Sequence, residues 1–117
     1  MYNKRSIGTK YEEIAKQYLS KSGVKILDNN FRCKIGEIDL IGKDGDTYVF
    51  VEVKYRKDLS LGHPAEAVDY KKRRTICRVA DYYRMKYKIS EYVPCRFDVV
   101  AILRDEIIWY KNAFDYI

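Results

Sequence analysis

Apolar residues recur along the chain with helical spacing in two separate regions. Over residues 7–21 apolar or small side chains return every three or four positions, and Gly23 follows as a stop signal. A second helical pattern begins after Asp69, which is suited to the N-cap position, and continues to about Lys88. The buried stripe of this second helix is expected at Val68, Ile76, Val79, Ala80 and Tyr83. The pattern therefore predicts two amphipathic helices.

Alternating and β-branched residues predict strands in the rest of the chain. The expected strands are 24–33, 37–43, 48–56, 92–103 and 106–111, with turns at 44–46 and 104–105. The third strand begins with apolar residues on both faces, so it is expected at the centre of the sheet. A helical turn is expected at 64–68, after a loop that contains His63. The predicted order is α-β-β-β-α-β-β, with one antiparallel meander and one crossover helix.

Composition narrows the class of protein. A chain of 117 residues, 47% hydrophobic and 34% charged, suits one α/β domain with a mixed sheet and helices on the sheet faces. No apolar run approaches the roughly 18 to 20 residues of a membrane span, and Cys33, Cys77 and Cys95 form no CxxC pair. We therefore expect a cytoplasmic protein with reduced thiols and no membrane contact. The net charge of +6, from 23 basic and 17 acidic residues, favours a polyanionic partner such as nucleic acid.

Acidic residues interrupt two strands that a helix should cover. Glu37 and Asp39 lie in GEIDLI, and Glu52 and Lys54 lie in VEVK. Charged side chains are costly on a covered sheet face, so their presence there needs a reason. Glu52 and Lys54 are two residues apart, and they should therefore point to the same face of their strand. A functional site is one explanation.

The turn between these strands determines how close the carboxylates come. If residues 44–47 form a four-residue loop closed by Lys43 and Tyr48, Asp39 lies directly opposite Glu52. With a two-residue loop, the two residues would be one diagonal step apart, about 7 to 8 Å between backbones. In either register the two carboxylates share a face and can be bridged by a cation.

Two carboxylates held close together require a shared proton, a basic neighbour or a hard divalent cation such as Mg²⁺. In one interpretation Asp39, Glu52 and the carbonyl oxygen of Val53 bind the metal. Lys54 would then position or activate water and stabilise charge on a phosphate. In the other, Glu52 and Lys54 form exposed cross-strand ion pairs, worth about 0 to 1 kcal/mol each. Spacing alone leaves both interpretations open.

An aspartate followed across a hairpin by Glu-x-Lys resembles the PD-(D/E)xK nuclease superfamily, although Ile38 replaces its proline. The resemblance becomes more specific over nearly the whole chain. The stretches GTKYEEIAKQYL, NNFRCKIGEIDLIGKDGDTYVFVEVKYR, RFDVVAI and NAF, together with the 72–83 helix, look like the YraN family. This likeness implies the restriction-endonuclease-like fold of archaeal Holliday-junction resolvases and a divalent metal, Mg²⁺ or Mn²⁺.

The resemblance also implies roles for individual residues. It assigns the first-helix glutamate to Glu12, the strand aspartate to Asp39 and the Glu-x-Lys pair to Glu52 and Lys54. Glu13 is an alternative to the first-helix residue.

Glu37 belongs to the same signature. It would either support the metal-binding carboxylates or bond Arg32 or Lys34. Arg96 and Asp98 also match the family pattern, and we expect them to pair structurally within the sheet rather than to brace the metal carboxylates.

Basic residues around the site are candidates for holding the substrate. We expect Arg56, Lys57, Lys72 and Arg74 to contact phosphates, and such contacts would be independent of base sequence. Lys72 and Arg74 match family positions. The alternative interpretation is that the basic residues of the second helix simply form its solvent-exposed face.

The combined expectation is a metal-dependent nuclease that acts on DNA, with branched or repair intermediates as candidate substrates. Two other functions use the same fold. One is a nucleic-acid-binding module that performs no hydrolysis, and the other is a dimeric adaptor. A homodimer is considered because a chain of this size covers little duplex alone.

Overall fold

The computed structural model describes residues 4–60, 62 and 68–117. Its elements are α1 (Lys4–Lys21), β1 (Lys25–Arg32), β2 (Glu37–Asp44), β3 (Thr47–Arg56), α2 (Tyr70–Lys86), β4 (Cys95–Leu103) and β5 (Glu106–Phe114). The predicted element order is confirmed. Except for Val68, the helical turn expected at 64–68 lies outside the described residues, as does His63.

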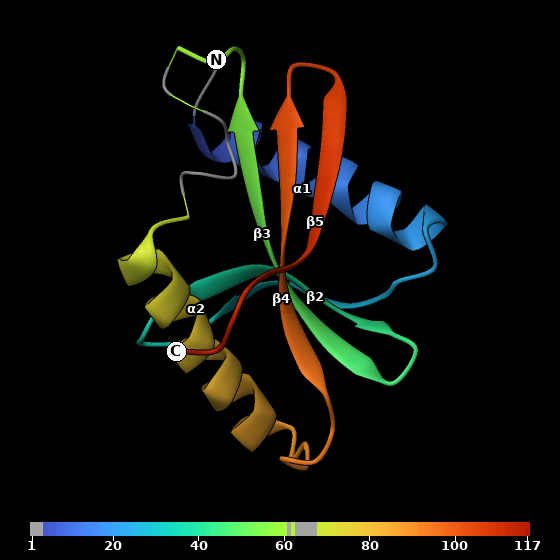
Figure 1. The fold of residues 1–117 in the computed structure, drawn as a ribbon, viewed down its shortest axis with the longest axis vertical. Helices are drawn as coiled ribbons and strands as arrows, with labels where there is room; N and C mark the ends of the chain where they lie inside the picture. Colours follow the sequence, from blue (N-terminus) through green and yellow to red (C-terminus); the bar gives the residue numbers. More distant parts are fainter. Residues whose placement is uncertain (1–3, 61, 63–67) are drawn as a thin grey trace.

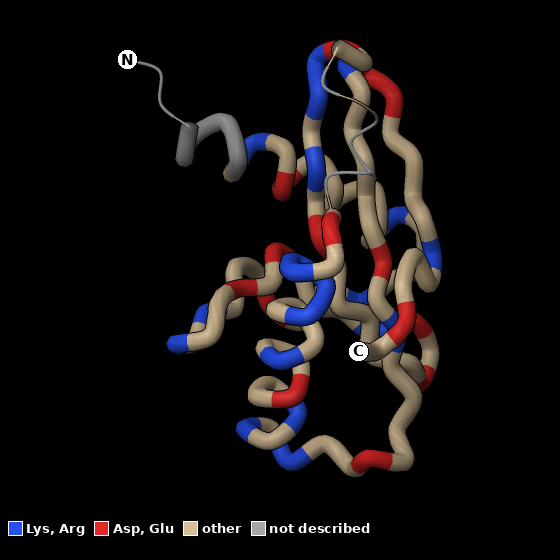
Figure 2. The backbone as a smooth tube through the Cα atoms, turned by 60° about the vertical axis from the view of Figure 1, so that its left-hand side comes forward, with Lys and Arg blue, Asp and Glu red and all other residues tan. Residues whose placement is uncertain are grey.

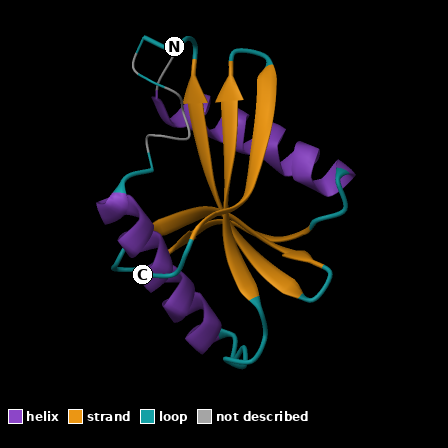
Figure 3. Cartoon of the chain, in the orientation of Figure 1, coloured by secondary structure: helices purple, strands orange, loops and turns teal. Residues whose placement is uncertain are grey.

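The strands form one mixed sheet in the order β1-β2-β3-β4-β5. β3 and β4 pair in parallel, and each of the other neighbouring pairs is antiparallel. A parallel pair needs a long crossover connection, and α2 supplies it. The sheet is strongly twisted, so β1 and β2 diverge in direction from β3, β4 and β5 (Figure 3). The expected meander, crossover helix and central third strand are all confirmed.

Several element boundaries differ from the prediction. α1 begins at Lys4 rather than at residue 7, and β5 ends at Phe114 rather than at residue 111. β4 begins at Cys95 rather than at residue 92, because Val93 N–H bonds Ser90 and Pro94 has no N–H to donate. The β2–β3 connection is a two-residue turn rather than a four-residue loop, since Asp44 pairs with Thr47. Gly45 has a φ of 62°, which suits the first central position of such a hairpin turn. Even so, Lys43 pairs with Tyr48, as in the first of the two predicted registers.

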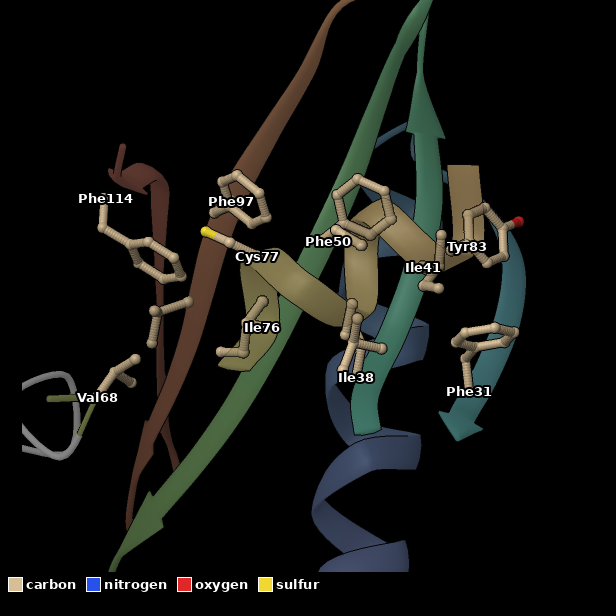
Figure 4. Packing of buried hydrophobic residues seen from close by; sticks show 13 residues of the cluster. Phe31, Ile38, Ile41, Phe50, Val68, Ile76, Cys77, Tyr83, Phe97 and Phe114 are labelled. Carbon is tan, nitrogen blue, oxygen red and sulfur yellow. The ribbon is translucent and has the colours of Figure 1, made fainter. Parts of the chain in front are cut away.

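The two helices cover opposite faces of the sheet (Figure 1). The apolar cluster between α1 and the sheet consists of Ala15, Leu19, Val24, Leu40, Val49, Val51, Val100 and Ile102. The cluster between α2 and the sheet is larger and rich in aromatic residues, including Phe31, Phe50, Tyr83, Phe97 and Phe114 (Figure 4). The stripe predicted for α2 is buried, and Cys77 joins it. Each helix is thus held by burial of its apolar side.

Two further findings concern membrane-spanning helices and the three cysteines. Within the described part of the chain, neither helix is long and apolar enough to cross a membrane. Cys33, Cys77 and Cys95 are free thiols, as the absence of a CxxC pair predicted.

Asp98 is a buried charge on the α1 face, and donors surround it. Its carboxylate is fully buried and accepts hydrogen bonds from Arg96 Nε at 3.1 Å, Trp109 Nε1 at 2.9 Å and the Asn112 backbone N–H at 2.8 Å. Arg96 also donates to Asp44 at 2.9 Å. The pairing expected for Arg96 and Asp98 is therefore present, and it ties β4 to the β5 strand and the β2–β3 hairpin.

Asp98→Ala should destabilise the protein by about 3 kcal/mol or more, because Arg96 and two further donors lose a buried acceptor. Urea unfolding followed by circular dichroism measures the change. Asp115→Ala is the matched control, since Asp115 is exposed, and it should change the free energy of unfolding little. Equal stability of the two variants would contradict a structural role for Asp98.

Candidate active site

The site forms where the β2–β3 ladder ends. Paired positions run from Asp44 and Thr47 to Leu40 and Val51, and Asp39 is the next residue of β2. Its Oδ2 accepts a hydrogen bond from the Val53 backbone N–H at 2.8 Å. A carboxylate therefore takes the place of a backbone carbonyl beside β3, and it stands next to the Glu52 strand position as the register predicted.

The local course of β2 turns Asp39 into this position. Residues two apart in a regular strand share a face. Ile38, however, packs in the cluster beneath α2, whereas Leu40 packs in the cluster beneath α1. The strand must rotate between these residues. Asp39, at the centre of the rotation, is only partly buried and is directed toward β3.

Glu52 is the buried carboxylate of the site, with only 5% of its surface exposed. Its Oε1 lies 3.9 Å from Lys54 Nζ on the same strand, and its Oε2 lies 3.8 Å from Lys72 Nζ on α2. Exposed cross-strand ion pairs, the simpler of the two alternatives for Glu52, are therefore wrong. A buried charge of this kind is tolerated because two ammonium groups compensate it.

The Asp39 carboxyl is also strongly perturbed. Burial, reinforced by the neighbouring Glu52 carboxylate, raises the pKa of Asp39 to about 8. The Val53 N–H and the Lys72 ammonium act in the opposite direction. Near neutral pH and without a divalent cation, a proton is therefore retained in this pair of carboxylates.

Glu12 reaches the site from α1. Its Oε2 accepts a hydrogen bond from Asn30 Nδ2 at 2.9 Å. Burial raises the pKa of Glu12, with further contributions from Asp39 and Glu37, and the Asn30 hydrogen bond opposes them. Glu13 is exposed and bonds Gln17 at 3.4 Å, so Glu12 rather than Glu13 lies beside Asp39.

Asn30 is a site residue that the sequence did not reveal. It lies between the Asn29–Leu40 and Phe31–Ile38 pairs, which places it opposite Asp39 in the β1–β2 register. Its φ of 52° is in the left-handed region, where asparagine is one of the few tolerated residues. An asparagine inside a predicted strand was the signal available in the sequence.

The donor set is small and consists of oxygen atoms. Within the described residues, no three Asp, Glu, His or Cys side chains gather closely enough to form a metal cage. Asp39 and Glu52 are two adjacent carboxylates, and the Val53 carbonyl is a third candidate donor. Mg²⁺ is commonly bound through one or two carboxylates while it keeps several waters, whereas structural Zn²⁺ needs four protein ligands. The residues present could hold Mg²⁺ or Mn²⁺.

The other residues proposed from the sequence lie around this centre. Glu37 pairs with Arg32, whose Nε lies 3.0 Å from Oε2, as one of its two predicted roles required. Arg56 is half-buried, and its Nε has no hydrogen-bond partner among the described residues. Lys57 and Arg74 are exposed, on the β3 end and on α2. Lys72, expected only to contact substrate, instead pairs with Glu52.

Comparison with known proteins identifies the family. A model described as "Uncharacterised protein family UPF0102" matches residues 11–102. The chain belongs to the UPF0102 family. A UPF0102 protein of Lachnoclostridium phytofermentans is 46% identical, over 97% of this chain and 96% of its own length. One from Vibrio campbellii is 48% identical over 97% and 95% of the two chains, and one from Caldicellulosiruptor saccharolyticus is 47% identical over 96% and 99%.

Asp39→Asn should change how the stability of this UPF0102 protein depends on pH. The folded protein keeps the Asp39 proton up to about pH 8, whereas the unfolded chain releases it near pH 4. In this interval the unmutated protein therefore loses stability as the pH rises, and the variant lacks that loss. The variant should be more stable at pH 8 by about 1 to 3 kcal/mol.

Urea unfolding in buffer with a chelator, at several values between pH 5 and pH 8, measures this effect. The difference in free energy of unfolding between the two proteins should grow steadily with pH. A difference that stays constant would contradict the raised pKa of Asp39.

Proposed function

We propose that this UPF0102 protein is a divalent-metal-dependent nuclease that hydrolyses phosphodiester bonds in DNA. The observation that carries the proposal is the pair of carboxylates at the end of the β2–β3 ladder, with Lys54 and Lys72 beside it. Perturbed carboxylates that face a basic residue are more common at functional sites than elsewhere. The arrangement contains an anionic centre for a cation and cationic groups for a phosphate.

Asp39, Glu52 and the Val53 carbonyl are the residues that would hold the cation. The N–H and C=O of one strand residue point toward the same neighbouring strand. Because the Val53 N–H donates a hydrogen bond to the Asp39 carboxylate, the Val53 carbonyl also points toward the Asp39 side of β3. Glu12 lies at the edge of this set through its bond to Asn30. Bound there, Mg²⁺ or Mn²⁺ would polarise a phosphoryl oxygen and activate water.

Lys54 is the residue that we assign to the reacting water and phosphate. Its ammonium lies 3.9 Å from Glu52 Oε1 and its side chain is 26% exposed, so it is both fixed and accessible. A lysine in this position can hold a water for attack and can stabilise the negative charge that develops on the phosphate. Glu52 keeps the ammonium oriented while both groups face the substrate side of the strand.

Basic residues near this centre suit a polyanionic substrate. Basic positions follow one another on the first turns of α2 (Figure 2). Arg56 carries a buried Nε that lacks a hydrogen-bond partner among the described residues, and Lys57 and Arg74 are exposed. Together with the net charge of +6, these groups favour phosphate contacts that are independent of base sequence.

The proposal extends to the superfamily and the setting of the protein. The mixed sheet, the Asp39 and Glu52-x-Lys54 positions and the α1 glutamate support membership of the PD-(D/E)xK superfamily with its restriction-endonuclease-like fold. DNA junctions or repair intermediates in the cytoplasm are the substrates that we propose.

Cleavage of linear, flap and four-way DNA, and of RNA, tests the proposal in titrations with Mg²⁺ and Mn²⁺. Asp39→Asn, Glu52→Gln and Lys54→Ala should each lower the rate by about 100-fold or more, since each removes a group that acts on the cation or the phosphate. Glu12→Gln should lower it by about tenfold, and Glu13→Gln is its matched control, with no loss.

Circular dichroism must show that each variant is folded. Cleavage that survives in folded Asp39→Asn or Glu52→Gln would overturn the assignment of the site. If the unmutated protein binds DNA but cuts no substrate with either metal, the protein is a nucleic-acid-binding module instead.

A further inference from the structure

Lys72 pairs with a buried carboxylate of the site, a contact that substrate binding alone would not require. Its Nζ lies 3.8 Å from Glu52 Oε2, so it neutralises a carboxylate that is 95% buried. It also interacts electrostatically with Asp39. Lys72 comes from the crossover helix rather than from the strand that carries Glu52. Glu52 is therefore contacted by one lysine at each oxygen, Lys54 from β3 and Lys72 from α2.

The neighbours of Lys72 on α2 are less available for this role. Arg73 donates from Nε to the Val68 carbonyl at 2.8 Å and lies over the Phe114 ring at 5.5 Å, so it fastens α2 to the sheet. Lys71 is exposed on the helix. Lys72 is 35% exposed, which leaves its ammonium a path toward solvent along a flexible four-carbon stem.

A divalent cation at Asp39 and Glu52 would compete with Lys72 for the same oxygen atoms. Both are positive, and two cations a few ångströms apart in a partly buried site repel strongly. Lys54 follows Glu52 by two residues on the same strand, and its side chain is 26% exposed, whereas the Lys72 side chain comes from α2 and is 35% exposed. Lys72 is therefore the group that should yield its place.

We propose that Lys72 is the internal counter-ion of Glu52 in the cation-free protein, and that cation binding releases its ammonium to a phosphate of the nucleic acid. The inference rests on the proposed function. It makes Lys72 a positioning residue that couples the two binding events: the cation frees the phosphate contact, and the phosphate in turn prevents Lys72 from returning to Glu52. By linkage, each ligand then strengthens binding of the other.

The first experiment measures cation affinity without nucleic acid, by calorimetric titration with Mn²⁺ and Mg²⁺. Lys72→Gln removes the competing charge and should bind the cation about tenfold more tightly than the unmutated protein. Lys72→Arg keeps the charge and should bind with nearly the unmutated affinity. Lys71→Gln, which removes one charge from the adjacent exposed position, should also leave the affinity unchanged.

The direction of the change decides between the two roles of Lys72. If it merely braces Glu52 in the correct orientation, Lys72→Gln will weaken cation binding, and that result, or an unchanged affinity, overturns the proposal. Thermal unfolding in the presence of chelator shows whether the variant is folded, and Lys72→Arg provides the folded comparison if Lys72→Gln is not. An Arg variant that binds the cation about tenfold more tightly would likewise overturn it.

The second experiment measures cleavage of a short DNA duplex at saturating Mg²⁺. Lys72→Gln should raise KM about tenfold with kcat nearly unchanged, because a released ammonium binds phosphate equally before and during the reaction. An unchanged KM overturns the phosphate contact while cleavage itself upholds the proposed function. If neither the unmutated protein nor Lys72→Gln binds a cation, the proposed function and this inference both fail.

Discussion

The structure depends on holding two carboxylates together in a sheet that a helix covers. Burial and repulsion from the Glu52 carboxylate both disfavour the charged form of Asp39. Three features make the arrangement tolerable: a backbone N–H for Asp39, an ammonium for each oxygen of Glu52, and a proton retained by Asp39. The apolar clusters on both faces must supply the stability that this site does not.

A comparison of Asp98 with Asp39 separates a structural carboxylate from a chemical one. Asp98 is fully buried, but fixed donors from Arg96, Trp109 and the Asn112 backbone saturate it. Asp39 has one backbone donor and a like-charged neighbour. An aspartate with enough donors therefore ties strands together on the α1 side. At the end of the β2–β3 ladder, an aspartate with one donor keeps oxygen lone pairs that a cation could bind. Neighbours rather than burial determine the role.

Much of the fold and the centre of the site could be predicted because both depend on local patterns. Helical spacing, turn residues and strand alternation depend on residues that are close in sequence, and the hairpin register alone placed Asp39 beside Glu52. The contacts of Lys72 and Asn30 could not be predicted in this way. Each depends on how a helix crosses the sheet, on the α2 side for Lys72 and on the α1 side for Asn30, and periodicity does not specify a helix's angle or translation.

The shortage of ligands at this site is itself an argument about its chemistry. A structural metal site is closed by its protein ligands, whereas a catalytic one must leave coordination positions for water and substrate. Two carboxylates and a strand carbonyl would supply only part of the oxygen ligands that Mg²⁺ takes, and waters or substrate would supply the rest. Such a site would bind the cation weakly in isolation and more firmly once a phosphate adds its oxygen atoms. Until a cation binds, the Lys72 ammonium would compensate the buried Glu52 carboxylate. The small number of ligands and the second lysine would then both follow from one requirement, that the site stay open for water and substrate.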